Sequence, residues 1–246
     1  MLSLENILES QIRQVTREWR DVLTDFMPLE EIMALKSMLD YSGVNYRIDG
    51  GHEEAARVRL YMTMHEEELS AEDMHIHVIR FSGNTKFIDF SHRDCLGALM
   101  SLGFERKCIG DIFIREQGFD VLTNGEIDDY LLMSNLSIKR VPMRVTLLDL
   151  ASWEAPAPKL ETGRIQVMQS RLDAVIAKVY NLSRAQAVNL IKAGMVQVNH
   201  VVSLSSSKQC EEGMVISVRG HGKFRMGPVD GMSKKGKINL LIEKYV

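Results

Sequence analysis

The chain has 246 residues, of which 45% are hydrophobic and 26% charged, with a formal net charge of −3. This composition is typical of a globular protein with one to three compact units, and it excludes an intrinsically disordered chain. No stretch reaches the roughly 18 consecutive apolar residues of a membrane helix, and the first residues lack the basic and then apolar layout of a secretory signal. We therefore expect a cytoplasmic protein with no membrane partner. The widely spaced Cys95, Cys108 and Cys210 favour reduced thiols over zinc or redox chemistry.

The charge is distributed unevenly along the chain. Residues 164–246 contain 13 Lys and Arg against 5 Asp and Glu, a balance of +8, whereas residues 1–163 contain 17 against 28, a balance of −11. A basic segment on an acidic body predicts a polyanionic partner bound at one end, because phosphate neutralisation supplies most of the non-specific affinity for nucleic acid. Charge alone also fits a solvated basic face without a partner.

Residues 1–72 are expected to form a mixed α+β subdomain. Apolar residues at spacings of three and four predict an amphipathic helix. These residues are Leu8, Ile12, Val15, Trp19, Val22 and Phe26. A second helix is predicted from Leu29 to about Leu39, and Gly50-Gly51 marks a turn. The run Glu53–Arg59 resembles the start of a further short helix.

Residues 73–150 alternate between strand and helix patterns. The predicted elements are strand 75–81, helix 94–102, strand 109–115, strand 119–122, helix 125–133 and strand 139–148. This β-α-β-β-α-β order predicts a ferredoxin-like domain, an arrangement shared with RNA-recognition motifs. The strand Ile109–Ile114 lacks the basic and aromatic signature of those motifs, so no base stacking is assigned to it. Residues 151–163 carry two prolines and are predicted to be a linker.

Residues 164–246 are predicted to form an α-α-β-β unit. A helix spans Arg171–Val179, and Ser183 with Gln186 forms a capping-box pattern that begins a second helix. Gly194 ends this helix, because glycine readily adopts the left-handed conformation. Strands are expected at 195–199 and 214–219.

The last unit resembles the S4 RNA-binding domain in several short motifs. These are Arg171-Leu172-Asp173, Leu182–Ala187, Leu190–Gly194, Val196–Asn199, and Glu212-Gly213 with Ile216–Gly220. With Gly50-Gly51, Leu96–Met100, Ile109–Ile112 and Gly220–Phe224, the whole chain resembles the YlmH family, which joins a two-part N-terminal region to a C-terminal S4 domain. The resemblance implies a non-catalytic RNA-binding protein of ribosome-associated quality control, which binds rRNA or tRNA on the large ribosomal subunit.

Candidate RNA-binding residues cluster in this S4-like segment. Arg184 is the first choice, since it adds a guanidinium group to the free backbone N–H groups at a helix start. The full set is Arg171, Ser183, Arg184, Gln186, Lys192, Asn199, Arg219 and Lys223. For Ser183 and Gln186, helix capping is an alternative role, and Arg171 has the alternative of pairing with an acid. No catalytic residue, cofactor or metal is expected.

Two other functions stay open. One is an RNA-modifying enzyme with an unrecognised active site in residues 1–150, although no nucleophile with a base and no phosphate loop is found there. The other is a cell-division scaffold, which would bind a protein partner through the acidic N-terminal region. Gly231–Lys235 is similar to a loop of class I aminoacyl-tRNA synthetases, and His75-x-His77 could begin a metal site, but both lack the surrounding residues.

Overall fold

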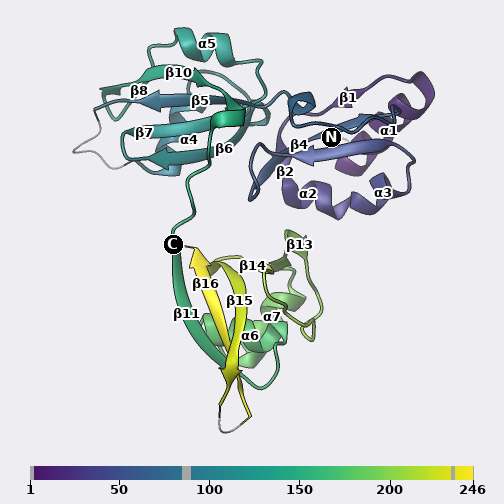
Figure 1. Ribbon diagram of the computed structural model, residues 1–246, viewed down its shortest axis with the longest axis vertical. Helices are drawn as coiled ribbons and strands as arrows, with labels where there is room; N and C mark the ends of the chain where they lie inside the picture. The colour runs from purple at the N-terminus through teal and green to yellow at the C-terminus, as the bar shows by residue number, and fades with distance from the viewer. Residues whose placement is uncertain (1–2, 85–89, 234–235, 246) are drawn as a thin grey trace. The chain divides into compact units, whose positions relative to one another are not determined.

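The computed structural model describes residues 3–84, 90–233 and 236–245. The chain forms two compact units, Met1–Pro156 and Ala157–Val246, which are described separately (Figure 1). Both units combine helices and strands, which confirms the α+β class. The boundary between the units lies inside the stretch 151–163. Lys234 and Lys235 of the 231–235 loop lie outside the described residues.

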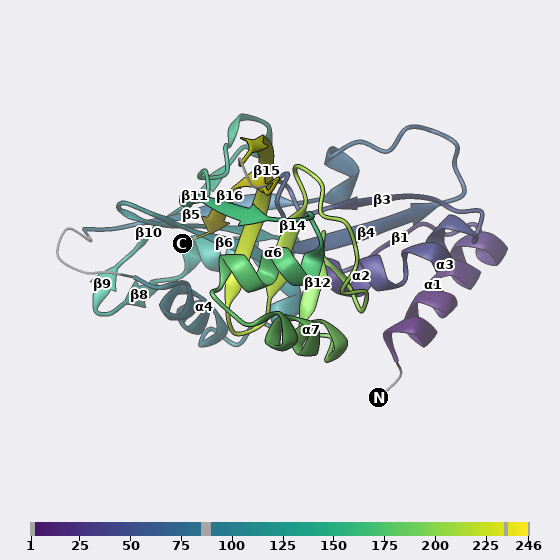
Figure 2. The same cartoon turned by 90° about the horizontal axis from the view of Figure 1, so that it is seen from below.

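The first unit begins with an N-terminal lobe, residues 3–74. Its elements are α1 (Leu4–Glu18), β1 (Val22–Leu23), β2 (Met27–Pro28), α2 (Leu29–Ala34), α3 (Lys36–Asp40), β3 (Asn45–Asp49), β4 (Arg57–Thr63) and the 3-10 helix η1 (Glu72–Met74). Strand β4 pairs antiparallel with β1, β2 and β3. The three helices lie on one face of β3 and β4 (Figure 2), where Leu8, Val15, Leu60 and Met62 are buried.

Three expectations for this lobe are corrected. The first helix ends at Glu18 because Trp19 adopts a left-handed conformation with φ 54°, and Val22 instead pairs with Met62 in the sheet. The predicted second helix breaks at Leu35 into two short helices. Glu53–Arg59 does not begin a helix, since Arg57 is the first residue of β4. In each case strand pairing or a local break overrides a helical spacing of apolar residues.

The middle domain, residues 77–148, completes the fold of the first unit. Its elements are β5 (His77–Ser82), α4 (His92–Met100), the 3-10 helix η2 (Arg106–Cys108), β6 (Ile109–Arg115), β7 (Gly118–Thr123), α5 (Asp128–Met133), β8 (Ser137–Ile138), β9 (Val141–Pro142) and β10 (Arg144–Leu148), followed by the 3-10 helix η3 (Leu150–Ser152). The antiparallel sheet has the order β10-β5-β7-β6. This arrangement confirms the ferredoxin-like prediction, with an extra β8–β9 hairpin that begins before the predicted last strand and takes up its first residues.

Both faces of this sheet are covered. Phe81 and Phe119 stack in parallel, 4.5 Å between ring centroids, in the core that includes α4 and α5 residues. On the other face, Val78 and Leu122 are buried in a cluster with Phe26 of the N-terminal lobe, and Trp153 packs against it. The face on which RNA-recognition motifs stack bases is therefore largely occupied by the protein itself.

The buried carboxylate of Asp120 accepts a hydrogen bond from the segment after β10 and so holds this segment on the same face of the sheet. Asp120 in β7 is fully buried and accepts hydrogen bonds from Arg80 Nε at 2.7 Å and Arg115 Nε at 2.8 Å. It also accepts a bond from Trp153 Nε1 at 2.8 Å. Because buried charges need partners, these three donors allow Asp120 to stay ionised inside the domain.

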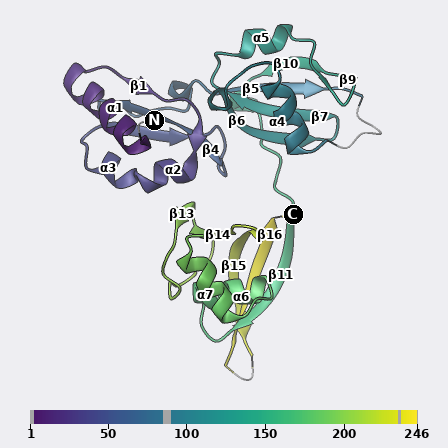
Figure 3. The same cartoon turned by 180° about the vertical axis from the view of Figure 1, so that it is seen from behind.

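The second unit is a six-stranded antiparallel sheet with two helices on one face (Figure 3). Its elements are β11 (Leu160–Val167), α6 (Leu172–Val179), α7 (Arg184–Lys192), β12 (Val196–Val198), β13 (Val201–Val202), β14 (Val215–Val218), β15 (Gly222–Met232) and β16 (Ile238–Tyr245). The α-α-β-β prediction is confirmed. Strand β11 pairs with β16 from Leu160 onward, so the last four residues of the predicted linker are strand. The core between helices and sheet includes Val175, Ile191 and Phe224.

Candidate nucleic-acid interface

A single buried carboxylate holds two arginines at the starts of the two helices of the second unit. Asp173, the second residue of α6, is 2% exposed. Arg171 donates to it through Nε at 3.2 Å and Nη2 at 3.0 Å. Arg184, the first residue of α7, donates through Nε at 3.2 Å and Nη2 at 3.4 Å. The two planar guanidinium groups are thereby brought together and oriented.

The electrostatics of this cluster keep Asp173 charged. Burial alone raises the pKa of its carboxyl group, but the hydrogen bonds from Arg171 and Arg184 outweigh burial and lower the pKa below its usual value. The side chain of Arg184 stays 60% exposed. The cluster therefore presents cationic charge to solvent while its buried anion fixes the geometry. The expected alternative for Arg171, pairing with an acid, is confirmed.

The capping box predicted at the start of α7 is present. Gln186 N donates to Ser183 Oγ at 3.2 Å, and Ser183 N donates to Gln186 Oε1 at 2.8 Å. These reciprocal bonds satisfy two backbone donors at the helix start and set the direction of the first turn. Ser183 and Gln186 therefore position Arg184 whether or not they contact RNA themselves.

The other predicted residues lie apart from this cluster. Lys192 is exposed in the last turn of α7. Asn199 has φ 49° in the β12–β13 turn, and its Oδ1 accepts from Val215 N at 2.8 Å. Arg219 follows β14 and its N–H donates to Met195 O at 2.9 Å.

Lys223 lies on the sheet face opposite the helices. Its neighbour Phe224 is buried beside Tyr180 of the helical side, and successive residues of a strand point to opposite faces. Lys223 Nζ is 4.2 Å from the ring centroid of Tyr245, and Arg225 Nη2 donates to the Tyr245 hydroxyl at 3.0 Å. Arg225 and Tyr245 were not among the predicted residues. Alternation along β15 puts Arg225 on the face of Lys223, whereas the position of Tyr245 depends on the pairing of β15 with β16.

A cavity of about 380 Å³ adjoins the arginine pair. It is lined by Gln166, Val167, Met168, Gln169, Arg171, Ala174, Ala177, Lys178, Asn181, Leu182, Arg184 and Lys237. The described lining includes four cationic residues and no Asp or Glu. Lys178 was not among the predicted residues, although its position seven residues after Arg171 puts both on one side of α6.

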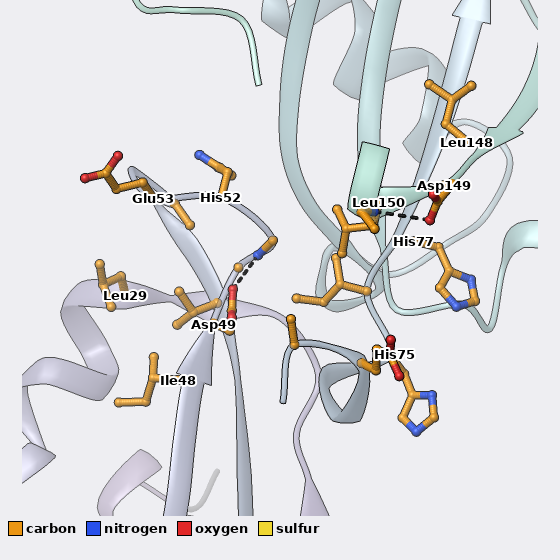
Figure 4. A pocket seen from close by; sticks show the side chains of 18 of the residues that line it. Leu29, Ile48, Asp49, His52, Glu53, His75, His77, Leu148, Asp149 and Leu150 are labelled. Atoms are coloured by element: carbon orange, nitrogen blue, oxygen red, sulfur yellow. Dashed lines mark hydrogen bonds between the residues drawn. The ribbon is translucent and has the colours of Figure 1, made fainter. Parts of the chain in front are cut away.

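The first unit contains a larger cavity of about 910 Å³, whose described lining carries carboxylates in place of Lys and Arg. Four carboxylates and three imidazoles line it, with no Lys or Arg among the described lining residues. Figure 4 shows His52 and Glu53 on one wall and His75, His77 and Asp149 on the other. Such a lining repels phosphate.

The histidines of this cavity do not form the metal site that His75-x-His77 could begin. His75 precedes β5 with φ 45°, and His77 Nδ1 lies 2.5 Å from the Asp128 carboxylate. His52 Nε2 lies 3.0 Å from Asp111. Among the described residues, no group of three or more His, Cys, Asp or Glu is arranged to hold a metal ion.

The cysteines are poor candidates for nucleophiles. All three are unpaired and buried. Burial raises the pKa of the Cys95 thiol to about 11 and that of Cys210 to about 12, and it also raises the pKa of Cys108. Because the thiolate is the reactive form, these groups are unreactive near neutral pH.

No helix among the residues that the structure describes is long and apolar enough to cross a membrane.

Comparisons with known proteins agree with this architecture. Residues 70–152 match the family described as "Putative RNA-binding domain in YlmH", and residues 170–216 match the S4 domain. The chain is 29% identical over 237 residues to the Ribosome-associated protein quality control protein P2 of Bacillus subtilis, covering 94% of this chain and 90% of the relative. The solved structure of the cell division protein ylmH from Streptococcus pneumoniae shares the fold of 61% of this chain, with a TM-score of 0.51 and 21% identity over 95% of that chain. The chain therefore carries a domain like the RNA-binding domain of YlmH followed by an S4 domain, and it is similar to YlmH proteins over most of its length.

Proposed function

We propose that this protein is a non-catalytic, ribosome-associated RNA-binding protein that holds structured RNA through its S4 unit, residues 157–246. The observation that carries the proposal is the pair of guanidinium groups of Arg171 and Arg184, fixed by buried Asp173 at the starts of α6 and α7. Arginine forks bind phosphate oxygens in a bidentate manner, and orientation before binding lowers the entropy cost of each contact.

The surroundings of the pair favour a polyanion. Residues 164–246 have a balance of +8, and the cavity beside the pair has no described acidic residue in its lining. Free N–H groups in the first turn of α7 add a favourable field for phosphate. Lys192, Arg219 and Lys223 are proposed as peripheral phosphate contacts, because they lie on other parts of the same basic unit.

The first unit is proposed to contribute less to RNA affinity. Residues 70–152 contain 9 Lys and Arg against 12 Asp and Glu, and residues 1–69 contain 7 against 14. The sheet face that RNA-recognition motifs use is covered by Phe26 and Trp153. The N-terminal lobe is the more acidic part, which suits a protein partner better than RNA.

The RNA partner is proposed to be rRNA or tRNA on the large ribosomal subunit. The name of the Bacillus subtilis relative, a ribosome-associated quality control protein, supports this choice. A role on stalled subunits that carry peptidyl-tRNA would require binding alone, in keeping with the absence of an activated nucleophile among the described cysteines.

Sedimentation through sucrose gradients tests the proposal. The full chain should migrate with large subunits, with or without bound tRNA, and return to the top at high salt. Replacing Arg171, Arg184 and Lys192 together with alanine should abolish co-migration. The matched control removes three exposed charges from the first unit, Arg13, Arg17 and Arg20, and should co-migrate like the wild type. A wild-type protein that stays at the top at low salt would refute the proposal.

A further inference from the structure

We infer that the cavity beside Arg171 and Arg184 accepts the base of one unpaired nucleotide of the bound RNA, while the arginines hold its phosphate. This inference rests on the proposed RNA-binding function and names the RNA feature that the S4 unit selects. It is carried by the size, the lining and the position of the cavity.

The size of the cavity suits one nucleotide. Its volume of about 380 Å³ lies at the lower end of the roughly 300–1,000 Å³ of small-ligand pockets. A paired helix cannot enter such a space, because its bases are stacked and joined to partners. Sequence-selective proteins instead take up bases that are already unstacked in loops and bulges.

The floor of the cavity is apolar and is formed by short side chains. Ala174 and Ala177 lie three residues apart on α6, so their methyl groups form a shallow surface beside Leu182. Val167 at the end of β11 is buried and also lines the cavity. A base face gains contact energy on such a surface, and longer side chains at 174 or 177 would fill the space.

The rim supplies groups for the rest of a nucleotide. Gln169 and Asn181 are exposed and carry amide groups, which can donate to and accept from a base edge. Gln166 is less available, since its Nε2 donates to Asn239 Oδ1 at 2.9 Å. The guanidinium planes of Arg171 and Arg184, held by Asp173, can pair with the phosphate or stack on the base.

Fluorescence of 2-aminopurine in the RNA tests this inference on the full chain. One hairpin carries a single bulged 2-aminopurine, and a matched hairpin carries the same base paired. We expect the bulged hairpin to bind about tenfold more tightly, because only its free base can bury apolar surface against Ala174, Ala177 and Leu182. Its emission should rise as the base loses its residual stacking on neighbouring RNA bases. The paired hairpin should bind weakly without this rise.

Variants that fill the cavity separate the base site from the phosphate contacts. Ala177→Leu, and Ala174→Leu as a second variant if the first does not fold, should lose the preference for the bulge and keep the weak binding of the paired hairpin. Ala157→Leu is the control, because Ala157 is exposed at the start of the second unit, before β11, and does not line the cavity. Arg184→Ala should weaken binding of both hairpins.

The outcomes distinguish the two proposals. Equal wild-type affinity for both hairpins, or unchanged emission from the bulged base, would overturn the nucleotide site while leaving RNA binding intact. Absence of binding to either hairpin and to ribosomal subunits would overturn the proposed function itself. Displacement of the bulged hairpin by submillimolar adenosine monophosphate would assign the cavity to a free nucleotide and would contradict the RNA inference.

Discussion

Replacing Asp173 with asparagine separates two explanations of RNA binding by the S4 unit. The substitution keeps the shape of the side chain and removes the one negative charge that Arg171 and Arg184 share. If affinity depended on net charge alone, Asp173→Asn would bind RNA as tightly as the wild type or more tightly. The substitution removes one of the five acidic residues in 164–246 and so makes the +8 charge balance of this segment more positive. We expect weaker binding, because the guanidinium groups lose their common anchor.

The stability cost follows from the burial of Asp173. A charge-assisted hydrogen bond contributes about 1.5–3 kcal/mol, and Asp173 is 2% exposed. Arg184 is 60% exposed and regains water when released, so we expect a total loss of only about 2 kcal/mol. A loss of about 2 kcal/mol lowers the free energy of local opening by the same amount. Backbone amide hydrogen exchange in α6 and α7 of the full chain should therefore become roughly 30-fold faster.

The same variant should change the pH dependence of stability. The pKa of Asp173 in the folded state is below its usual value. Its stabilising contribution is therefore complete above the pKa of an unfolded aspartate and is lost as the pH falls through the lower, folded value. Below about pH 4 the exchange rates of the wild type in α6 and α7 should approach those of Asp173→Asn.

Fluorescence anisotropy with a labelled structured RNA measures the affinity. The reasoning is refuted if Asp173→Asn binds more tightly than the wild type at equal salt while its helices exchange at the wild-type rate. That result would mean that net charge governs binding and that the orientation of the arginines does not.

Three further predictions concern single contacts, salt and backbone geometry. Arg184→Ala should weaken RNA binding by about 1–3 kcal/mol, and Arg184→Lys should be intermediate because it keeps the charge without the planar guanidinium group. Anisotropy titrations that are unchanged for both variants, with an unchanged circular dichroism spectrum, would remove Arg184 from the interface. The affinity of residues 157–246 for structured RNA should fall by orders of magnitude between about 50 and 200 mM salt if 6 or more phosphates are contacted, and a flat salt titration would contradict this. Gly118→Ala should destabilise the first unit by about 3 kcal/mol or more, because φ is +140° and the new Cβ would lie 1.9 Å from Phe81 O. Gly97→Ala in α4, whose new Cβ would meet no atom within 4 Å, should be neutral or stabilising. Urea titration of both variants of the full chain measures these changes in unfolding free energy.

The elements with strong local signals could be predicted from the sequence. The capping box of Ser183 and Gln186 and the alternating strands of the middle domain correspond to elements of the structure. In these segments the hydrophobic period, the turn residues and the tertiary contacts all favour one structure. The S4 motifs lie in such a segment, so the position of Arg184 at a helix start was predictable.

The N-terminal lobe was harder to predict because long-range pairing decides its structure. The apolar spacing through Val22 and Phe26 continues that of α1, but Val22 pairs with β4 and Phe26 packs in the cluster that includes Val78 and Leu122. A residue that packs in a distant hydrophobic cluster can, by chance, also continue the apolar spacing of a neighbouring helix. The helix prediction at Glu53–Arg59 failed for the same reason, since β4 is the central partner of its sheet.

The candidate site was predictable in part. Its residues were found from charge and motif, but their grouping was not, because it depends on the buried carboxylate of Asp173 joining two helix starts. Lys223 lies on the other sheet face because it alternates with buried Phe224 along β15, and its contact with Tyr245 depends on the pairing of β15 with β16. The cavity arises from the side chains of β11, α6 and residue 237 together, and no local pattern encodes it.

Ultraviolet crosslinking of the full chain to ribosomal subunits, followed by mass spectrometry of the crosslinked peptides, tests the central claim most directly. We expect crosslinks within residues 166–192, around Arg171 and Arg184, and their loss in the variant with Arg171, Arg184 and Lys192 replaced by alanine. Crosslinks concentrated in residues 77–148, and unchanged in that variant, would contradict it and assign the RNA contact to the middle domain.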